Sequence, residues 1–382
     1  MKEAKRLVNI QEYYFSGKLK EIYDLNKQGA DIINIGIGSP DLPPPKSVVD
    51  ELVRVSQLPD SHTYQSYRGI EALRVAIQFF YQKHYNVTMQ ADDEILALMG
   101  SKEGIMHISM AFLNEGDIAL VPNPGYMTYT SATLLTGAKP VYYELKEAEN
   151  YLPNIADLEK MDLTNCRIMW LNYPHMPTGA RATKNAFEDL IAFAKKHNIL
   201  LVNDNPYSLI LNDDLLSILQ VKGAKDVAIE LNSLSKSHNM AGWRIGMLLG
   251  KASYINAVMK FKSNMDSGMF YAMQMAAVKA LQIDDSWYKK QNKIYQKRKR
   301  IVMQILEKLS LKASNTQSGL FVWAKLPTSQ NSKDFSDKIL QKHRVFITPG
   351  YIFGKQSDNY MRISLTTNET RLKEVLNRLK NN

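Results

Sequence analysis

One lysine of this sequence stands where an amine could react. Lys236 directly follows a strand-like run and lies between Ser235 and Ser237, eight positions before Arg244. An amine with an ordinary pKa of about 10.4 is mostly protonated, but an amine held in a pocket beside other cations loses its proton and attacks carbonyl carbons. Ser233, Ser235 and Arg244 supply hydroxyl donors and a guanidinium fork that suit a phosphate dianion. A lysine imine beside a phosphate cup is the chemistry of pyridoxal phosphate, although without its context the lysine is most simply a surface residue.

Four segments elsewhere could complete such a site. Residues 100–104, Gly-Ser-Lys-Glu-Gly, follow a strand-like run and open a helix, so that free backbone N–H groups can receive phosphate, as at many similar turns. Asp204 follows another strand-like run, where a buried carboxylate could hold a pyridine nitrogen protonated; a helix or turn cap is an equally good interpretation. Tyr126, in a Pro-Gly-Tyr turn, can stack on a ring or fill the core. Residues 172–179 form a turn-rich loop after a further run.

These residues need a scaffold, and the pattern of apolar residues predicts one. From about residue 92 to residue 250, short apolar runs alternate with amphipathic helical stretches such as residues 103–113 and 185–197. Strands and helices in this order form crossover units and a mostly parallel sheet that is covered on both faces. Ligands bind such sheets beyond the carboxyl ends of the strands, where the turns above lie. The expected strands are residues 95–98, 117–121, 141–145, 167–171, 199–203, 228–234 and 244–249.

The rest of the chain predicts a second, smaller unit. The pattern is helical from residue 250 to residue 309, and an α+β block follows. The first forty residues are too few to fold alone, so we expect them to pack on that block. A length of 382 residues suits two domains, and we predict a large domain over residues 45–285 and a small domain from residues 1–44 and 286–382. The expected elements of the block are strands at 320–325, 345–348 and 360–365 and helices near 332–343 and 369–379.

Composition excludes several classes of protein. Hydrophobic residues make up 45% and charged residues 23%, which is typical of a globular chain and not of a disordered or collagen-like one. The 48 basic and 38 acidic residues give a net charge of +10, but the densest basic run, residues 296–300, is interpreted as a solvated helix face rather than a nucleic-acid site. Cys166 is the only cysteine, which excludes an intrachain disulfide and a cysteine-rich metal site. Without a secretory signal or an apolar span, we expect a cytoplasmic protein that binds no metal, membrane or nucleic acid.

Taken together, the motifs resemble those of the class I and II aminotransferases, pyridoxal phosphate enzymes of fold type I, over nearly the whole chain. The segment 233–246 is similar to the lysine signature of that family. The resemblance implies an α/β fold, with a mostly parallel seven-stranded sheet sandwiched by helices and a smaller α+β domain made from both termini. The remaining motifs appear in the family's order: Gly-x-Pro-Asp at 38–41, Tyr-x-x-x-x-Gly at 64–69, the phosphate turn, Tyr126, Pro-Thr-Gly at 177–179, Asp-x-x-Tyr at 204–207, and the segments 348–354 and 360–364.

The resemblance also implies roles around the cofactor ring. Lys236 would form the internal aldimine with pyridoxal 5'-phosphate and then shuttle a proton between the substrate α-carbon and the C4′ carbon of the cofactor. Asp204 would pair with the pyridinium nitrogen, and Tyr207 would donate a hydrogen bond to the phenolate oxygen. Tyr126 would stack on the ring. Asn172 would face the cofactor from the turn-rich loop.

Further roles are implied for the phosphate, the substrate and a second subunit. Arg362 would clamp the substrate α-carboxylate bidentately, with the backbone of Gly38 closing over it. Tyr64 would reach the phosphate from a neighbouring subunit, so that a homodimer is the expected form. The phosphate would be bound by Ser101, Lys102 (through its backbone), Ser233, Ser235 and Arg244.

Two enzyme activities fit these residues. An aminotransferase would move an amino group from an L-amino acid to a 2-oxo acid. Arg362 would bind the substrate carboxylate, Asp204 would support the electron-accepting ring, and Lys236 would be the mobile base. A carbon–sulfur β-lyase, similar to cystathionine lyases, uses the same fold and residues but eliminates a β-substituent, and it is the alternative. A cofactor-sensing regulator is disfavoured, because only about forty residues precede the Gly-x-Pro-Asp turn. A second carboxylate of the substrate has three conceivable binders, each more simply a surface residue: Lys260, Lys262 and Arg68.

One position departs from the family pattern and generates a prediction. The family usually has Asn directly before Pro-Thr-Gly, with an amide that donates to the phenolate oxygen of the cofactor, but this chain has Met176. A thioether cannot donate a hydrogen bond, and the loss of a donor disfavours the phenolate and so favours the protonated imine. We therefore expect the pKa of the internal imine to be higher than is usual in the family. A pH titration of the imine absorbance measures it, and an imine already unprotonated well below neutrality would contradict the expectation.

Overall fold

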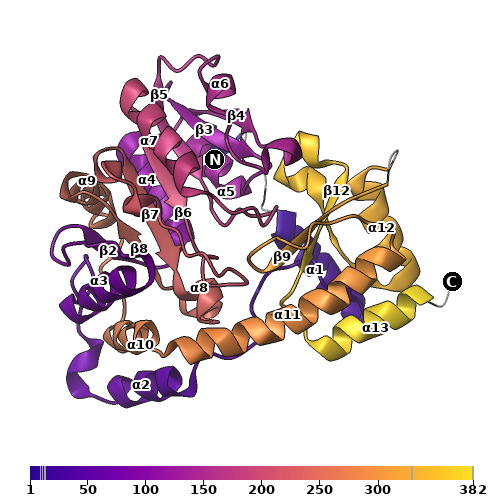
Figure 1. Cartoon of the computed structure of the whole chain (residues 1–382). Coiled ribbons are helices and arrows are strands. Elements are labelled where there is room, and N and C mark those ends of the chain that lie inside the picture. The colour runs from indigo at the N-terminus through magenta and orange to yellow at the C-terminus, as the bar shows by residue number, and fades with distance from the viewer. Residues whose placement is uncertain (9, 11, 13, 328–329, 381–382) are drawn as a thin grey trace.

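A seven-stranded sheet forms the larger part of the molecule (Figure 1). The computed structural model describes residues 1–8, 10, 12, 14–327 and 330–380 of the chain. The strands lie in the order β2-β8-β7-β6-β5-β3-β4, and β8 runs against the others, so the predicted mostly parallel sheet is confirmed. The strands are β2 (Ile95–Leu98), β3 (Ile118–Asn123), β4 (Lys139–Glu144), β5 (Cys166–Leu171), β6 (Leu200–Asp204), β7 (Ala228–Ser233) and β8 (Gly246–Leu249).

Helices cover both faces of this sheet, so each face has its own apolar core. Along β3, for example, Leu120 packs into one core while Ala119 and Val121 pack into the other, because successive side chains of a strand point to opposite faces. α3, α7 and α10 contribute to the first core, and α4, α5 and α9 to the second. The helices of this part are α2 (Lys46–Ser56), α3 (Glu71–Tyr85), α4 (Ser101–Phe112), α5 (Met127–Leu135), α6 (Ile155–Leu158), α7 (Lys184–His197), α8 (Leu234–Ser237), α9 (Ala252–Lys262) and α10 (Tyr271–Leu281).

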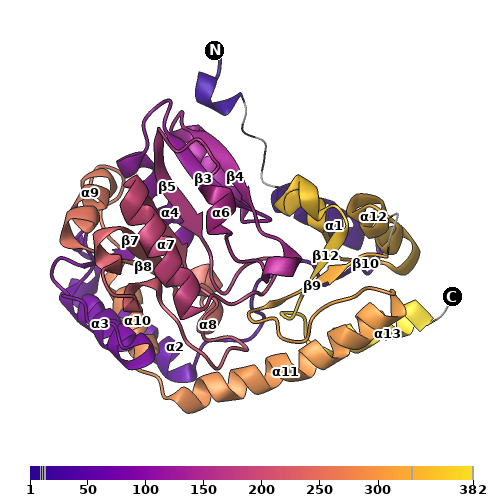
Figure 2. The same ribbon diagram turned by 45° about the horizontal axis from the view of Figure 1, so that its top comes forward.

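The second part is built from both ends of the chain. β9 (Phe321–Lys325), β11 (Thr348–Pro349) and β12 (Tyr360–Ser364) form an antiparallel sheet in the order β11-β12-β9, and β1 (Ile33–Asn34) pairs in parallel with β10 (Val345–Phe346). The long helix α11 (Asp285–Lys308) runs from beside α10 to α13, joining the two parts (Figures 1 and 2). The domain boundaries at residues 45 and 285 stay a prediction. The other helices here are α1 (Tyr14–Lys27), α12 (Ser332–His343) and α13 (Glu369–Lys380).

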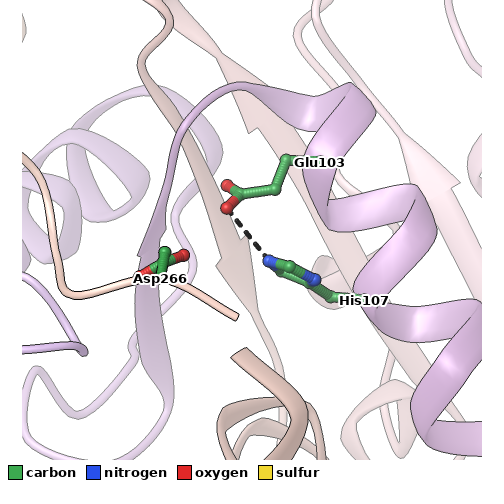
Figure 3. A group of neighbouring side chains, drawn as sticks. All are labelled: Glu103, His107 and Asp266. Carbon is green, nitrogen blue, oxygen red and sulfur yellow. Dashed lines mark ion pairs between the residues drawn. The ribbon is translucent and has the colours of Figure 1, made fainter. Parts of the chain in front are cut away.

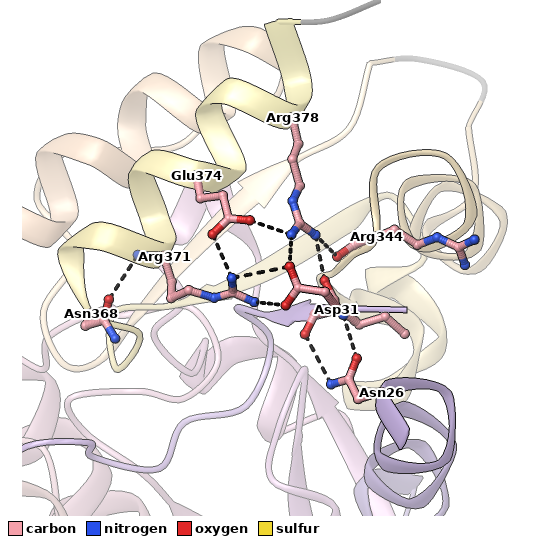
Figure 4. A network of polar contacts seen from close by, with 8 residues as sticks. Asn26, Asp31, Arg344, Asn368, Arg371, Glu374 and Arg378 are labelled. Atoms are coloured by element: carbon pink, nitrogen blue, oxygen red, sulfur yellow. Dashed lines mark hydrogen bonds and ion pairs between the residues drawn. The ribbon is translucent and has the colours of Figure 1, made fainter. Parts of the chain in front are cut away.

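An ionic network ties the N-terminal segment to α13 (Figure 4). Asp31 lies between two arginines of α13: Arg371 Nη2 is 2.6 Å from its Oδ1, and Arg378 donates both to its carboxylate and to its carbonyl oxygen. Glu374 lies between the same two arginines. Asp31 is 59% exposed, so each pair alone contributes little, and the value of the network is that it joins segments more than 300 positions apart in the sequence.

The basic run 296–300 of α11 is only partly a solvated face. Lys297 and Arg300 are exposed, as predicted, but Arg298 is buried and donates to both carboxylate oxygens of Asp41, at 2.7 and 2.8 Å. Lys299 donates to two backbone carbonyls of the 315–317 turn, at 2.8 and 2.7 Å. The helical periodicity of the sequence did not reveal the burial of Arg298, because its partner Asp41 is 257 positions away in the Gly-x-Pro-Asp turn.

Several predicted strand ends differ from the structure by one or two residues, and two of these differences concern the segment around the lysine. Leu234 was expected in a strand but begins the short helix α8, so that the residues after it turn back over the sheet edge. Arg244 was expected to open a strand but has a left-handed φ of 57°, which a non-glycine residue rarely adopts. That turn leads the chain into β8, while the guanidinium of Arg244 lies against Gly100.

None of the helices in the described residues is long and apolar enough to cross a membrane.

Candidate active site

The predicted site residues gather in one cavity of about 560 Å³, with Tyr64 as the exception. The cavity lies beyond the carboxyl ends of β5, β6 and β7, and residues from α1, β9 and β12 cover it from the second part of the molecule. Its position follows the rule for parallel sheets, because neighbouring strand ends meet at one edge. The predicted residues that line it are Gly38, Ser101, Lys102, Tyr126, Asn172, Asp204, Tyr207, Ser233, Ser235, Lys236, Arg244 and Arg362.

The Lys236 amine lies in this cavity, on the one-turn helix α8. Its Nζ donates a hydrogen bond to the carbonyl oxygen of Gly38 at 2.7 Å. Burial, and then the nearby guanidinium groups of Arg362 and Arg244, lower the pKa of Lys236 to about 8, against the smaller opposite effect of Asp204. About a tenth of this amine is therefore neutral at pH 7, far more than for an ordinary lysine, and the neutral form is the one that acts as a nucleophile or a base.

The carboxylate of Asp204 ends β6 and is buried. Tyr129 donates to its Oδ2 at 3.0 Å, and Asn172 donates to its backbone carbonyl at 2.5 Å. Burial raises the pKa of Asp204 to about 7, and the charge of Glu230 adds to the rise, while the hydrogen bond from Tyr129 and the charge of Lys236 oppose it. Oδ1 is buried and has no hydrogen-bond partner within the part of the chain that the structure describes.

A phosphate-sized cup forms where α4 begins. Gly100 has a φ of +91°, and a Cβ there would lie 2.1 Å from Nη2 of Arg244, so the turn needs glycine both for its backbone and for the close approach of the guanidinium. Ser101 Oγ is buried and without a partner among the described residues. Ser233 and Ser235 approach the same cavity from the end of β7. The free N–H groups of the first turn of α4, the hydroxyls and the guanidinium together suit an anion.

Behind this turn lies a buried group of charged side chains (Figure 3). Glu103 accepts a hydrogen bond from the backbone N–H of Met99 and pairs with His107 at 3.0 Å, and Asp266 lies beside both. Such a group could hold a metal ion, but Nζ of Lys262 lies 2.6 Å from Asp266 and already places a cation there. Lys262 is thus a buried structural partner and not the surface residue that was the simpler expectation.

Arg362 projects from β12 into the opposite wall of the cavity. Three phenylalanine rings lie within 5.2 Å of its guanidinium carbon: Phe321 at 4.0 Å, Phe353 at 4.8 Å and Phe15 at 5.2 Å. Nη2 donates to the carbonyl oxygen of Gly36 at 2.8 Å, and Nη1 lies 3.3 Å from the sulfur of Met176. An arginine surrounded by aromatic rings is partly desolvated, which strengthens its attraction for a carboxylate.

In the turn-rich loop, the side chain of Asn172 forms its hydrogen bonds with backbone groups. The side-chain oxygen of Asn172 accepts from the N–H of Met176 at 2.8 Å, while its amide holds the Asp204 carbonyl. Met176 is buried and lines the cavity where the family pattern has an amide. Tyr207 is also buried, which raises the pKa of its hydroxyl, and Tyr126 lies edge-on to Tyr129 with 5.6 Å between ring centroids.

The positions that sequence reasoning missed are aromatic. Tyr129 was not singled out, although it follows Tyr126 by three positions and therefore shares its face of α5. Phe15, Phe321 and Phe353 come from three distant segments, and nothing in the sequence links them to Arg362. Tyr64 lies outside the cavity and is 91% exposed, which is where a residue that serves a neighbouring subunit would lie.

The cavity residues fit pyridoxal phosphate. Oδ1 of Asp204 is a buried acceptor without a partner in the described residues and suits a pyridinium N–H donor. Oγ of Ser101 is a buried hydroxyl without a partner in the same part of the chain and lies where Arg244 and the start of α4 favour a phosphate. Lys236 supplies an amine of lowered pKa, and the cavity volume is that of a small-molecule site.

Comparisons with known sequences agree with this arrangement. The family model for aminotransferase class I and II matches residues 30–379. An LL-diaminopimelate aminotransferase of Halothermothrix orenii is 38% identical over 383 aligned positions, which cover 100% of this chain and 98% of that protein. An LL-diaminopimelate aminotransferase of Dehalococcoides mccartyi is 39% identical over 381 positions, covering 99% of this chain and 98% of that protein. Relatives with these names favour amino-group transfer over the lyase alternative.

Solved structures show the same fold over the whole chain. Substrate-bound BacF from Bacillus subtilis superposes with a TM-score of 0.94 at 35% identity, covering 100% of this chain and 97% of that one. An aminotransferase from Staphylococcus aureus gives 0.90 at 33% identity, with 99% and 98% covered. Aspartate aminotransferase from Thermotoga maritima gives 0.91 at 29% identity, with 99% of each chain covered.

The lowered pKa of Lys236 generates a prediction for the cofactor-free protein. Because only the neutral amine reacts, acylation of Lys236 in short pulses of acetic anhydride should rise with pH to a half-maximum near pH 8. Arg244→Met removes a neighbouring cation and should move the half-maximum to higher pH. Exposed Lys20, whose pKa is raised by the hydrogen bond to Asp24, is the internal control and should still be gaining reactivity at the top of the pH range. Peptide mass spectrometry measures both, and a common midpoint for the two lysines would contradict the prediction.

Proposed function

The chain belongs to the class I and II aminotransferase family, and on that premise we propose that it moves an amino group from an L-amino acid to a 2-oxo acid with pyridoxal 5'-phosphate bound at Lys236. One observation carries the proposal. An amine of lowered pKa, a buried carboxylate with one oxygen unpartnered among the described residues, and an arginine ringed by phenylalanines all line the same cavity of about 560 Å³. This combination suits a cofactor that carries an aldehyde, a ring nitrogen and a phosphate.

Acidic and basic residues of the chain would have separate roles toward the cofactor. When bound, the cofactor supplies a carbonyl carbon and a ring that accepts electrons. Oδ1 of Asp204 would hold a proton on the ring nitrogen, and the start of α4 with Arg244 would hold the phosphate. Once released, the Nζ of Lys236 would take the proton from the substrate α-carbon and return it, since its pKa of about 8 lets it act as base and then as acid near neutral pH.

Arg362 would orient the substrate. Its guanidinium is held by the carbonyl oxygen of Gly36 and by three aromatic rings, so the fork is fixed before a carboxylate arrives. A fixed fork binds an α-carboxylate in two parallel hydrogen bonds and sets the α-hydrogen toward Lys236. Phe15 of α1 and Phe321 of β9 would also keep water from this end of the cavity.

The choice of donor is open to direct test. The curated relatives are named for LL-diaminopimelate, so this amino acid is the first donor to compare, together with glutamate, aspartate and phenylalanine. In a stopped-flow experiment we expect at least one of them to abolish the long-wavelength absorbance of the protein, and a 2-oxo acid to restore it. Arg362→Lys should raise the KM for the donor by about tenfold or more, because a lysine cannot make the bidentate contact.

The same reaction separates transfer from elimination. With cystathionine and a 2-oxo acid, an aminotransferase forms a new amino acid, whereas a β-lyase releases pyruvate and ammonia. Formation of pyruvate and ammonia without a new amino acid would contradict the proposal.

We also propose that the enzyme is a homodimer in which each subunit completes the site of the other. Tyr64 is 91% exposed, and further large apolar side chains are exposed on the segments beside it. The 64–69 loop packs against residue Gly268, and Phe270 stacks on His62, so these segments form one continuous surface. The exposed apolar side chains on it and on the adjoining α2 are Val49, Val53, Leu58, Tyr67, Met265 and Phe270. A second copy that covers this surface would bury them and carry Tyr64 to the neighbouring cavity.

Mixing two inactive variants tests the shared site. If Tyr64 serves the neighbouring subunit, refolding Tyr64→Ala together with Lys236→Ala yields hybrid dimers with one intact site, and activity recovers to about a quarter of the wild-type value. If Tyr64 serves its own subunit, every site in the mixture lacks one of the two residues and no activity returns. Sedimentation velocity of each variant alone controls for loss of the dimer.

A further inference from the structure

A buried carboxylate lies outside the cavity, on the strand next to Asp204. Glu230 of β7 is fully buried, and four donors reach its two oxygens. Tyr81 donates to Oε1 at 3.0 Å and Asn205 at 3.3 Å, while Asn203 donates to Oε2 at 2.9 Å and the N–H of Ile218 at 3.1 Å. All four donors are neutral. Burial raises the pKa of Glu230, and hydrogen bonds from the asparagine amides, the Ser217 side chain and the N–H of Ile218 oppose that rise.

Two of these donors are the neighbours of Asp204 in the chain. Asn203 and Asn205 flank Asp204, and both bond the same carboxylate. β6 and β7 are parallel here, with Asn203 opposite Glu230 and Asp204 opposite Leu231. The backbone N–H of Asn205 continues the ladder to the Leu231 carbonyl at 2.8 Å. The backbone on either side of Asp204 is therefore held by Glu230.

We propose that Glu230 is a positioning residue, which keeps Oδ1 of Asp204 pointed into the cavity by holding the two asparagines that flank it. The inference rests on the proposed function, in which Asp204 pairs with the ring nitrogen of the cofactor. The side chain of Asp204 has a single hydrogen bond in the described residues, from Tyr129 to Oδ2, so the direction of Oδ1 depends mainly on the backbone that carries it.

The contacts of Glu230 also extend, through Asn203, to the turn-rich loop that begins at Asn172. The side-chain oxygen of Asn203 accepts from the N–H of Tyr173 at 3.2 Å, and the preceding residue, Asn172, donates to the Asp204 carbonyl. Glu230 thus bonds the side chain of Asn203, and Asn203 in turn bonds the start of the loop whose Asn172 donates to Asp204. A change at Glu230 should reach Asp204 through two routes. The route to the phosphate cup is longer, because it runs from Tyr81 through Asn232 to the N–H of Ser233, so we expect a smaller effect there.

The competing explanation is a polar core that only stabilises the fold. Nearby, Tyr85 shares a hydrogen bond with Ser208 and accepts one from Asn232, in the same buried region but without a bond to either neighbour of Asp204. Loss of the Tyr85 hydroxyl would therefore weaken the fold and leave Asp204 in place. Tyr85→Phe is the matched control for Glu230→Gln, which keeps the volume of Glu230 but turns one acceptor into a donor.

The test is a binding titration of the cofactor-free proteins. For Glu230→Gln we expect the Kd for pyridoxal 5'-phosphate to rise by about tenfold or more, with the affinity for inorganic phosphate unchanged within about twofold. For Tyr85→Phe we expect a lower melting temperature of the cofactor-free protein and an unchanged Kd for the cofactor. Asn205→Ala leaves Glu230 in place but removes one link to Asp204, and it should raise the cofactor Kd in the same direction.

Each result bears on a separate claim. If Glu230→Gln does not fold, Asn205→Ala carries the comparison, and an unchanged cofactor Kd in that variant overturns the inference. If Glu230→Gln and Tyr85→Phe raise the Kd equally, or if the phosphate affinity falls as much as the cofactor affinity, Glu230 has only a structural role. If the wild-type protein shows no saturable binding of the cofactor, the proposed function itself fails.

Discussion

Lys236, Arg244 and Arg362 line one cavity together with Lys102, and the fold brings them there from two parts of the molecule. Lys236 and Arg244 come from the segment between β7 and β8, while Arg362 comes from β12 in the other part of the molecule. Burial is the main cause of the lowered pKa of Lys236, and repulsion from the guanidinium groups of Arg362 and Arg244 lowers it further. Polar contacts outside the cavity join the distant segments of the second part, among them the pair of buried Arg298 with Asp41 and the network around Asp31.

The distribution of partners is consistent with this. In the cavity and on the adjacent strand β7, acids accept hydrogen bonds from neutral donors: Tyr129 for Asp204, and the asparagine amides and Tyr81 for Glu230. Ion pairs between buried groups lie elsewhere, as for Lys262 with Asp266. If Asp204 were paired with a protein cation, its Oδ1 would be occupied and its pKa would fall. Neutral donors leave the cations of the cavity available for the anionic groups of ligands.

The sequence predicted the sheet and most of the cavity, because both depend on local patterns. Strands buried on two faces are continuous apolar runs, and the residues of the cavity stand directly after such runs, as Ser101, Asp204 and Ser233 do. What the sequence did not reveal depends on contacts between distant segments. Phe15, Phe321 and Phe353 surround Arg362 from three elements, and Arg298 is buried by a partner 257 positions away. Arg244 was placed in a strand because apolar patterning does not reveal a left-handed residue.

The net charge of +10 also says nothing about where in the fold the cations lie. A sum over the sequence counts Arg244, Arg362 and Lys236 together with cations elsewhere on the surface, although these three line the cavity. In the densest basic run, the burial of Arg298 and the backbone bonds of Lys299 leave Lys297 and Arg300 as the exposed cations. The cations with an evident chemical use are those turned inward, toward anions the size of a phosphate or a carboxylate.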